Sequence, residues 1–299
     1  MRIGFIGLGN MGGGMAANQA KAGRDVIAFD LSADALARAA QHGCKPAASA
    51  IEAVSDVDAV ITMLPAGPHV RSLYAEVLIP HAKKGALLID CSTIDVDSAR
   101  AVASQALAAG YRAADAPVSG GTAAADAGTL AFMVGGAETD FPEVESVLSP
   151  MARVVIRAGE AGAGQAAKIC NNMLLGISMI GTCEAFALAE KLGLEADRFF
   201  EIASKSSGQC WSVTSYCPVE GVGPSTPADR NFDGGFASAM MLKDLKLAQE
   251  AASRAGASTP LGASAEALYA LFVGQGYAKR DFSAVVQWLR GRTDTLAKD

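Results

Sequence analysis

The stretch RIGFIGLGNMG, residues 2–12, decides the fold of this chain. It begins with the short apolar run Arg2–Ile6, which predicts a strand, and residues Asn10–Lys21 then predict a helix. Between them lies Gly7-Leu8-Gly9-Asn10-Met11-Gly12, a G-x-G-x-x-G pattern. The pattern alone is weak, but at a strand-to-helix junction it is typical of dinucleotide-binding folds.

Each glycine has an expected task in such a loop. Gly7 would permit the tight turn, Gly9 would let the backbone approach a pyrophosphate, and Gly12 would let the helix pack closely on the strand. The beginning of the helix would offer unpaired N–H groups and a positive dipole end to the phosphates. The alternative is a glycine-rich turn that binds nothing.

Asp30 ends the next apolar run, roughly 20 residues past the glycine loop, where an acid can bind the ribose hydroxyls of the adenosine. Its carboxylate would repel a 2′-phosphate, and the next residues are Leu31 and Ser32 rather than arginine. The sequence therefore predicts NAD rather than NADP. If Asp30 serves only as a helix cap, this preference loses its support.

The first half of the chain alternates between apolar runs and alanine-rich stretches with helical periodicity. Strands are expected at Arg2–Ile6, Asp25–Asp30, Asp58–Leu64, Gly85–Asp90, Arg112–Ala116, Leu130–Val134 and Arg153–Ile156. Further helices are expected at Ala33–Gln41, His69–His81 and Val96–Ala109. Such alternation predicts crossover units and an α/β, Rossmann-type doubly wound parallel sheet.

The pattern changes near residue 160. Glu160–Gly164 is glycine-rich and indicates a hinge, and Gln165–Lys191 reads as one long helix. Further helices are expected at Ala196–Ser204, Met240–Arg254, Leu261–Val273 and Phe282–Arg290. The proline- and glycine-rich stretch Tyr216–Gly235 predicts an ordered loop across the surface. We therefore expect an NAD-binding Rossmann domain at residues 1–161 and an all-helical domain at residues 162–299.

The composition supports two globular domains in 299 residues, with 51% hydrophobic and 19% charged residues. The net charge of −6 and the lack of a Lys/Arg cluster argue against a nucleic-acid partner. A membrane partner is not expected either, because Met173–Ile180 is too short to span a bilayer and no other window has enough uninterrupted apolar residues.

The cysteines and the start of the chain indicate the compartment. The six cysteines form no C-x-x-C pair, and the three histidines show no metal-ligand spacing, so we expect buried, reduced thiols and no metal. Cys210, beside Trp211, is the expected exception and would line a pocket. The glycine loop follows the first strand at once, which leaves no room for a targeting segment and predicts a cytoplasmic protein.

Three blocks of the sequence resemble the β-hydroxyacid dehydrogenase family, most closely its 3-hydroxyisobutyrate dehydrogenases. They are FIGLGNMGGGMAAN at residues 5–18, DAPVSGG at 115–121 and GAGQAAKICNNMLL at 162–175. Shorter matches are MLP at 63–65, DCSTID at 90–95, SSGQCW at 206–211 and MLKDL at 241–245. The resemblance covers essentially the whole chain.

The resemblance implies that Lys168 is the catalytic acid and base and that Asn172 assists it. The two residues are four apart, so they share one face of the long helix. A lysine with a lowered pKa can take the proton of a hydroxyl group, and burial or a nearby nicotinamide cation would lower that pKa. Taken alone, a lysine on a helix is usually a solvated surface charge.

The resemblance also implies the substrate and cofactor contacts. Ser119, Gly120 and Gly121 would hold the substrate carboxylate, since backbone N–H groups and a hydroxyl in a turn form a nest for an anion. The implied cofactor contacts are Leu64, Pro65, His69, Thr93 and Lys243. Alternatively, Gly120 and Gly121 form an ordinary loop turn and His69 is an exposed loop residue. Lys243 would instead pair with Asp244 on the surface of a helix. Trp211 would pack against the active site or in the core.

The implied reaction is reversible oxidation of 3-hydroxyisobutyrate to methylmalonate semialdehyde by NAD, a step of valine breakdown. Other small acids, such as tartronate semialdehyde, succinic semialdehyde or serine, would suit the same site. A nucleoside-dependent methyltransferase would leave the lysine unexplained, and an imine-reducing relative would lack it. A non-catalytic NAD-binding scaffold would bind the cofactor without turnover. The apolar long helix predicts a homodimer or homotetramer.

Overall fold

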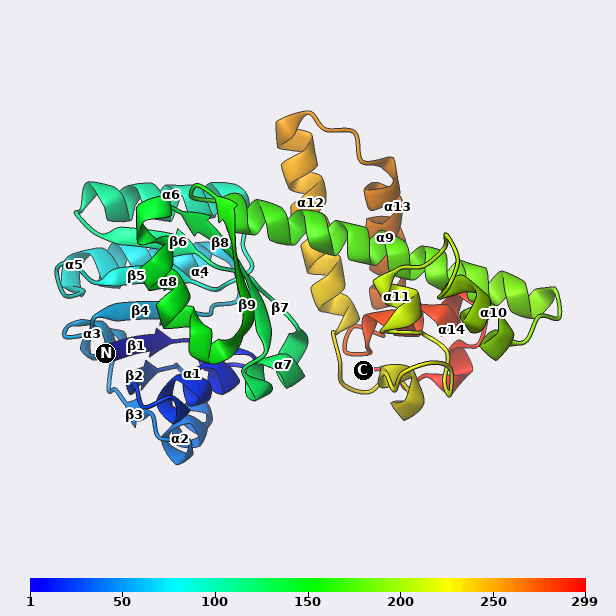
Figure 1. The fold of residues 1–299 in the computed structure, drawn as a ribbon, viewed down its shortest axis with the longest axis horizontal. Coiled ribbons are helices and arrows are strands. Elements are labelled where there is room, and N and C mark those ends of the chain that lie inside the picture. The colour runs from blue at the N-terminus through cyan, green and yellow to red at the C-terminus, as the bar shows by residue number, and fades with distance from the viewer. The chain divides into compact units, whose positions relative to one another are not determined.

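The computed structural model describes residues 1–299 and divides into two compact units, Met1–Lys168 and Ile169–Asp299. The first unit contains all the strands and the second is helical, as Figure 1 shows. The predicted fold class, a Rossmann-type sheet followed by an all-helical part, is confirmed. The long helix α9, Ala163–Lys191, begins in the first unit and continues into the second.

A nine-stranded sheet forms the centre of the first unit. Its strands are β1 Arg2–Ile6, β2 Asp25–Phe29, β3 Lys45–Pro46, β4 Ala59–Thr62, β5 Leu87–Asp90, β6 Arg112–Asp115, β7 Val118–Ser119, β8 Leu130–Gly136 and β9 Ala152–Gly159. The order is β3-β2-β1-β4-β5-β6-β8-β7, and β9 also pairs with β8. The chain therefore reverses its direction of progress between β1 and β4, which is the topological switch point of a doubly wound sheet.

Helices cover both faces of this sheet (Figure 1). They are α1 Gly12–Lys21, α2 Ala33–Gln41, α3 Ala50–Val54, α4 Gly67–Leu73, α5 Ile79–His81, α6 Val96–Ala108, α7 Gly121–Ala127 and α8 Phe141–Leu148. Strand residues alternate between two cores: Leu87 and Ile89 join one, and Leu88 joins the other. The central strands are thus apolar on both faces, which explains their continuous apolar runs.

One edge of the sheet is antiparallel, so the parallel arrangement that the alternation predicts does not extend to that edge. The pairings from β3 through β6 are all parallel, but β8 runs antiparallel to β6 and β7. A parallel return requires a crossover of about a dozen residues or more. The connection from β7 to β8 is residues 120–129, which contain the short helix α7. No element was predicted from the sequence at β3, β7, α3, α7 or α8. Of these, β3 and β7 have two residues each, too few to show periodicity.

The expected helix at His69–His81 is interrupted. A π-helical turn at Tyr74–Leu78 separates α4 from α5. Pro80 follows this turn, and proline lacks an N–H and crowds the carbonyl four residues earlier in a regular α-helix. The wider turn accommodates the proline.

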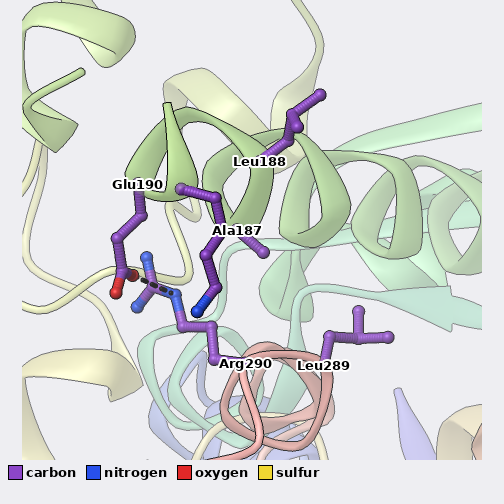
Figure 2. Close-up of a pocket in the computed structure, with 6 residues that line it drawn as sticks. Ala187, Leu188, Glu190, Leu289 and Arg290 are labelled. Carbon is purple, nitrogen blue, oxygen red and sulfur yellow. Dashed lines mark ion pairs between the residues drawn. The ribbon is translucent and has the colours of Figure 1, made fainter. Parts of the chain in front are cut away.

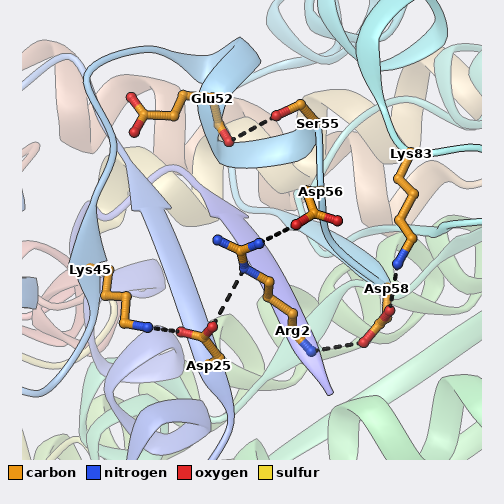
Figure 3. Close-up of polar contacts among 8 residues, drawn as sticks. All are labelled: Arg2, Asp25, Lys45, Glu52, Ser55, Asp56, Asp58 and Lys83. Carbon is orange, nitrogen blue, oxygen red and sulfur yellow. Dashed lines mark hydrogen bonds and ion pairs between the residues drawn. The ribbon is translucent and has the colours of Figure 1, made fainter.

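The amino-terminal edge of the sheet carries a network of surface charges, shown in Figure 3. Lys45 pairs with Asp25 at 2.7 Å, and Lys83 pairs with Asp58 at 3.1 Å. The backbone N–H of Arg2 donates to Asp58 at 2.9 Å, and this bond together with Lys83 lowers the pKa of the Asp58 carboxyl. These side chains are largely exposed, so water and salt screen the ion pairs and each pair contributes little to stability.

The second unit packs helices around one main apolar core. Besides α9 they are α10 Ala196–Ala203, α11 Trp211–Thr214, α12 Ser238–Ala255, α13 Pro260–Gly274 and α14 Val285–Leu289. Core members include Met179 and Cys183 on α9, Met241 and Leu245 on α12, and Tyr269 on α13. No strand forms here apart from an isolated bridge between Ala237 and Asp281.

The predicted loop at Tyr216–Gly235 is ordered, but it does not merely cross the surface. Cys217 and Phe232 are buried within it. The buried carboxylate of Asp281 accepts hydrogen bonds from the Tyr216 hydroxyl at 2.9 Å and from the Phe236 N–H at 2.8 Å. The sequence missed this anchoring because Asp281 lies far along the chain.

Helix α9 corrects the prediction about membrane-spanning windows. Its 29 residues are long and apolar enough to cross a bilayer by length and composition. A core helix of a folded domain passes the same test, and α9 supplies Met179, Ile180 and Cys183 to the core of the second unit. The interrupted apolar pattern that suggested a shorter segment reflects the partly polar faces of this helix.

Candidate active site

The predicted site residues of the first unit follow a row of aligned strand ends. The register places Phe29, Ile6, Thr62, Asp90 and Asp115 side by side at the carboxyl ends of β2, β1, β4, β5 and β6. The candidates Asp30, Gly7, Leu64, Thr93 and Ser119 come one to four residues after these ends. Open α/β sheets bind ligands at this edge.

The glycine loop has the geometry that a dinucleotide requires. A Cβ on Gly7, where φ is +94°, would lie 2.2 Å from the carbonyl oxygen of Met63, and one on Gly12 would lie 1.9 Å from that of Gly7. A Cβ on Gly9 would meet no protein atom within 4 Å, so that side of the loop is open. No side chain caps the start of α1, and its first turn contains no acid. The loop therefore fits a pyrophosphate.

Asp30 braces the glycine loop. One carboxylate oxygen accepts the Leu8 N–H at 2.6 Å and the other accepts the Ser32 N–H at 2.8 Å. A carboxylate has about four lone-pair positions, so the ribose hydroxyls can still bind to it. Leu8 itself is buried, so its side chain packs in the core.

Exchanging Leu31 for arginine tests the cofactor preference. Leu31 is 95% exposed beside Asp30, so an arginine there would reach solvent without disturbing the core. We expect Leu31→Arg to raise kcat/KM for NADP about tenfold, because a guanidinium pairs well with a phosphate. Initial rates with NADP and NAD, before and after the change, measure this. An unchanged ratio would contradict the placement of the ribose at Asp30.

A buried hydrogen-bond chain shapes the next two loops. One oxygen of Asp90 accepts the hydroxyls of Thr62 at 2.7 Å and Ser92 at 2.6 Å. The Ser92 oxygen in turn accepts the Leu64 N–H at 2.8 Å. The loop after β4 is therefore tied to the loop after β5, and these loops carry the predicted cofactor contacts Leu64, Pro65 and Thr93.

The turn predicted to bind the substrate carboxylate has a backbone conformation that requires glycine. Gly120 and Gly121 have φ of +140° and +70°, and a Cβ on Gly120 would lie 2.6 Å from that of Ala124. Helix α7 follows, and the Asn18 side chain on α1 donates to its Ala125 carbonyl at 2.7 Å. The helix after the glycine loop thus packs directly on the helix after the carboxylate turn.

Asp115 connects the end of β6 to the first turn of α9. Its carboxylate accepts the Gly162 N–H at 2.6 Å and the Gln165 N–H at 2.9 Å. Burial raises the pKa of Asp115 to about 6, with a further contribution from Asp90, while the two N–H groups oppose the shift. Gln165 is fully buried and donates to the Ser92 carbonyl at 2.7 Å.

This raised pKa predicts how stability depends on pH. The carboxyl titrates near its usual pKa of 3.8 in the unfolded chain and near 6 in the folded one. Its contribution to stability is therefore fully present below the first value and is lost as pH rises through the second. The unfolding free energy of wild type minus that of Asp115→Asn should fall by about 3 kcal/mol across this window. Urea unfolding of both proteins checks this, and a pH-independent difference would contradict it.

Lys168 and Asn172 lie one turn apart on α9, and both are buried, with exposures of 7% and 2%. Their order on the helix confirms the shared face that their spacing predicts. In the second unit the Asn172 amide donates to Asp244 on α12, which also carries the half-buried Lys243. Asp244 therefore orients Asn172.

The remaining candidates have different environments. His69 is exposed on α4, and Pro65 is exposed before it. Trp211 is 51% exposed and stacks on Tyr216 with 4.8 Å between ring centroids, so it is not a core residue. Cys210 is half-buried and lies 3.7 Å from the Thr182 hydroxyl. Four of the six thiols are buried, as expected, but Cys170 is exposed, which the sequence did not indicate.

One pocket in the helical unit is unrelated to these residues (Figure 2). Ala187, Leu188, Glu190 and Lys191 of α9 line it together with Leu289 and Arg290, and Glu190 pairs with Arg290 at 3.2 Å. It contains none of the predicted site residues. The functional candidates lie instead at the strand ends and on α9 and α12.

Comparison with known proteins agrees with this geometry. Residues 2–159 match the family described as "NAD binding domain of 6-phosphogluconate dehydrogenase", and residues 162–289 match "NAD-binding of NADP-dependent 3-hydroxyisobutyrate dehydrogenase". A probable 3-hydroxyisobutyrate dehydrogenase of Mycobacterium bovis is 49% identical over 98% of this chain and 99% of its own. An NAD-dependent L-serine dehydrogenase of Pseudomonas aeruginosa is 48% identical over 95% of this chain and 96% of its own.

A solved structure of a 3-hydroxyisobutyrate dehydrogenase is also similar to this chain. Mycobacterium tuberculosis 3-hydroxyisobutyrate dehydrogenase, described with L-serine, superposes with a TM-score of 0.94 at 49% identity, over 97% of this chain and 99% of that one. The fold, the glycine loop and these relatives define an NAD-dependent oxidoreductase. The chain belongs to the β-hydroxyacid dehydrogenase family, as its sequence blocks predicted.

Proposed function

We propose that this enzyme oxidises 3-hydroxyisobutyrate to methylmalonate semialdehyde with NAD, as a reversible step of valine breakdown. The observation that carries the proposal is the buried Lys168 on the first turns of α9, within the block GAGQAAK. The names of relatives such as the Mycobacterium bovis protein support the substrate.

The proposed mechanism assigns a task to each group of residues. Bound NAD would supply the hydride acceptor for this oxidation. Lys168, in its neutral form, takes the proton of the substrate hydroxyl during oxidation, and once protonated it returns that proton during reduction. Asn172 holds this geometry through its own hydrogen bonds, and Asp244 orients its amide.

The same proposal assigns the binding residues. Ser119, Gly120 and Gly121 hold the substrate carboxylate with a hydroxyl and backbone N–H groups. The proposed cofactor contacts are Gly7, Leu8, Gly9, Asn10, Met11, Gly12, Asp30, Leu64, Pro65, His69, Thr93 and Lys243. Leu8 serves through its backbone, since its side chain is buried. Fixed groups around both reactants supply alignment and electrostatics, which is how a protein assists cofactor chemistry.

L-serine is the second candidate substrate. One relative is named for L-serine, and the Mycobacterium tuberculosis structure is described with it. Serine and 3-hydroxyisobutyrate share a carboxylate and a primary hydroxyl on the third carbon, and they differ in an ammonium against a methyl group. The same lysine and carboxylate turn suit both. Tartronate semialdehyde and succinic semialdehyde are further candidate substrates for the same site.

An initial-rate assay of NADH formation tests the proposal. The substrates are both enantiomers of 3-hydroxyisobutyrate, L-serine, glycerate and 4-hydroxybutyrate, each with NAD and with NADP. The proposal expects the highest kcat/KM for one enantiomer of 3-hydroxyisobutyrate with NAD. A higher value for L-serine would keep the mechanism and change the substrate. Cofactor binding without turnover of any acid would favour the scaffold instead.

The helical part carries a proposal about assembly. Residues 162–299 form the proposed domain for substrate binding and oligomerisation, after an NAD-binding domain at 1–161. On α9, Leu174 and Leu188 are 62% and 60% exposed, and Leu192 just beyond it is 76% exposed. We expect these apolar side chains to be covered in a homodimer or homotetramer in the cytoplasm. Light scattering that shows only monomer at micromolar concentration would contradict this.

A further inference from the structure

We infer that Asp115 and Gln165 are positioning residues for the reaction: they fix the first turn of α9, and with it Lys168, to the strand ends. The inference rests on the proposed function, because it needs Lys168 as the acid and base. All three residues belong to the first unit.

Asp115 serves as a helix cap supplied from another part of the chain. Helices usually begin at a Ser, Thr, Asn or Asp whose side chain accepts an N–H of the first turn. Here the residues before α9 are Glu160, Ala161 and Gly162, and none of them is such a residue. The carboxylate of Asp115, 47 residues before Gly162 in sequence, accepts the Gly162 and Gln165 N–H groups instead.

Two glycines make room for this carboxylate. A Cβ on Gly135 of β8 would lie 2.4 Å from one oxygen of Asp115, and a Cβ on Gly164 of α9 would lie 2.7 Å from the other. A strand and a helix therefore both omit a side chain where the carboxylate enters. Packing this close restricts displacement of the first turn of α9, because protein interiors are dense and transmit displacement.

Gln165 holds the same turn from the other side. Its amide donates to the Ser92 carbonyl at 2.7 Å, and its amide oxygen accepts the Ile94 N–H at 3.1 Å. These two bonds bracket Thr93, one of the proposed cofactor contacts. The side chain is completely buried.

These contacts also determine where the Lys168 backbone lies. It lies three residues after Gln165, within one helical turn of it. Asp115 in turn lies four residues before Ser119, at the start of the proposed carboxylate turn. The base, the loop of Thr93 and the carboxylate turn are thus tied to one another. A displacement of the base by about 1 Å lowers a rate by about a hundredfold.

The experiment compares Asp115→Asn and Gln165→Leu with the matched control Gln19→Leu. Gln19 is also fully buried in the first unit, but its amide donates to the Val147 carbonyl at 2.6 Å and holds α1 on α8. Each variant is assayed for kcat, KM, the Kd of NADH and amide hydrogen exchange across residues 162–168. Each anchor substitution is also combined with Lys168→Ala.

The inference predicts a tenfold to hundredfold loss of kcat, roughly, in both anchor variants. The Kd of NADH should stay within about twofold in Asp115→Asn, and kcat of Gln19→Leu should also stay within about twofold of wild type. In the Lys168→Ala background the anchor substitutions should cost less than about twofold more, because residues that act through one group are not additive. Amide hydrogen exchange at residues 162–168 should be faster in Asp115→Asn. If Asp115→Asn does not fold, the exchange measured in Gln165→Leu decides the test.

Unchanged exchange in both anchor variants would overturn the inference whatever the rates show. So would wild-type kcat in both of them, an equal loss of kcat in Gln19→Leu, or a full additional loss in the Lys168→Ala background. Wild-type turnover by Lys168→Ala would instead contradict the proposed function. The exchange readout does not depend on the reaction, so the two failures are distinguishable.

Discussion

Replacement of Lys168 by alanine is expected to lower kcat by a factor of about 10² to 10⁴, the range that one positioned acid or base contributes. The lysine is 7% exposed, so its loss removes a buried amine that water does not readily replace at the same point. The effect should fall on kcat, and the Kd of NADH should change by no more than about threefold, because the lysine moves a proton rather than binding the phosphates. Steady-state rates and NADH titration measure the two quantities.

Lys191→Ala is the matched control for this substitution. Lys191 ends the same helix, is exposed, and lines the pocket between α9 and Arg290. It should keep kcat within about twofold, since surface substitutions rarely disturb a distant site. An equal loss of kcat in both variants would show damage to α9 rather than loss of the base, and wild-type kcat in Lys168→Ala would exclude Lys168 as the base.

The second large effect is expected from Gly9→Ala. An added methyl group meets no protein atom within 4 Å, so the melting temperature without cofactor should stay as in wild type. The same methyl group would occupy the open side of the loop, where a pyrophosphate approaches the backbone. We expect the Kd of NAD to rise by a factor of about 10² or more, which corresponds to about 3 kcal/mol of lost binding.

Two other glycines serve as references for this result. Gly12→Ala places its Cβ 1.9 Å from the Gly7 carbonyl and should lower the melting temperature as well as the affinity. Gly181→Ala, at an open position of α9, should leave NAD binding unchanged. Wild-type NAD affinity in Gly9→Ala would mean that the pyrophosphate binds elsewhere.

The sequence predicted the parts of the fold that depend on local periodicity. The strands from Arg2–Ile6 to Gly85–Asp90 and the long helix after residue 162 have patterns long enough to identify them. The antiparallel edge was missed, because strand direction depends on where the chain returns after α7. The π-helical turn at Tyr74–Leu78 was also missed, although Pro80 is the signal that indicates it.

Some residues of the candidate site were also predictable from the sequence, and others were not. The glycines, Asp30 and the blocks around Ser119 and Lys168 are visible as motifs, and the structure shows where their backbones lie. The supporting contacts of Asp115, Gln165 and Asp90 join residues 28 to 73 positions apart, and no local pattern reports them. The signal that could have revealed Asp115 was its place within DAPVSGG, an acid beside apolar residues at the end of a buried strand.

Transfer of deuterium tests the central claim most directly. The enzyme is incubated with NAD and 3-hydroxyisobutyrate that carries two deuterium atoms on the hydroxyl-bearing carbon, and the reduced cofactor is analysed by mass spectrometry. The account predicts one deuterium in each NADH formed by the wild type, and a much lower rate of its appearance with Lys168→Ala. Bound NAD that remains oxidised and unlabelled with this substrate and with correspondingly labelled L-serine would contradict it.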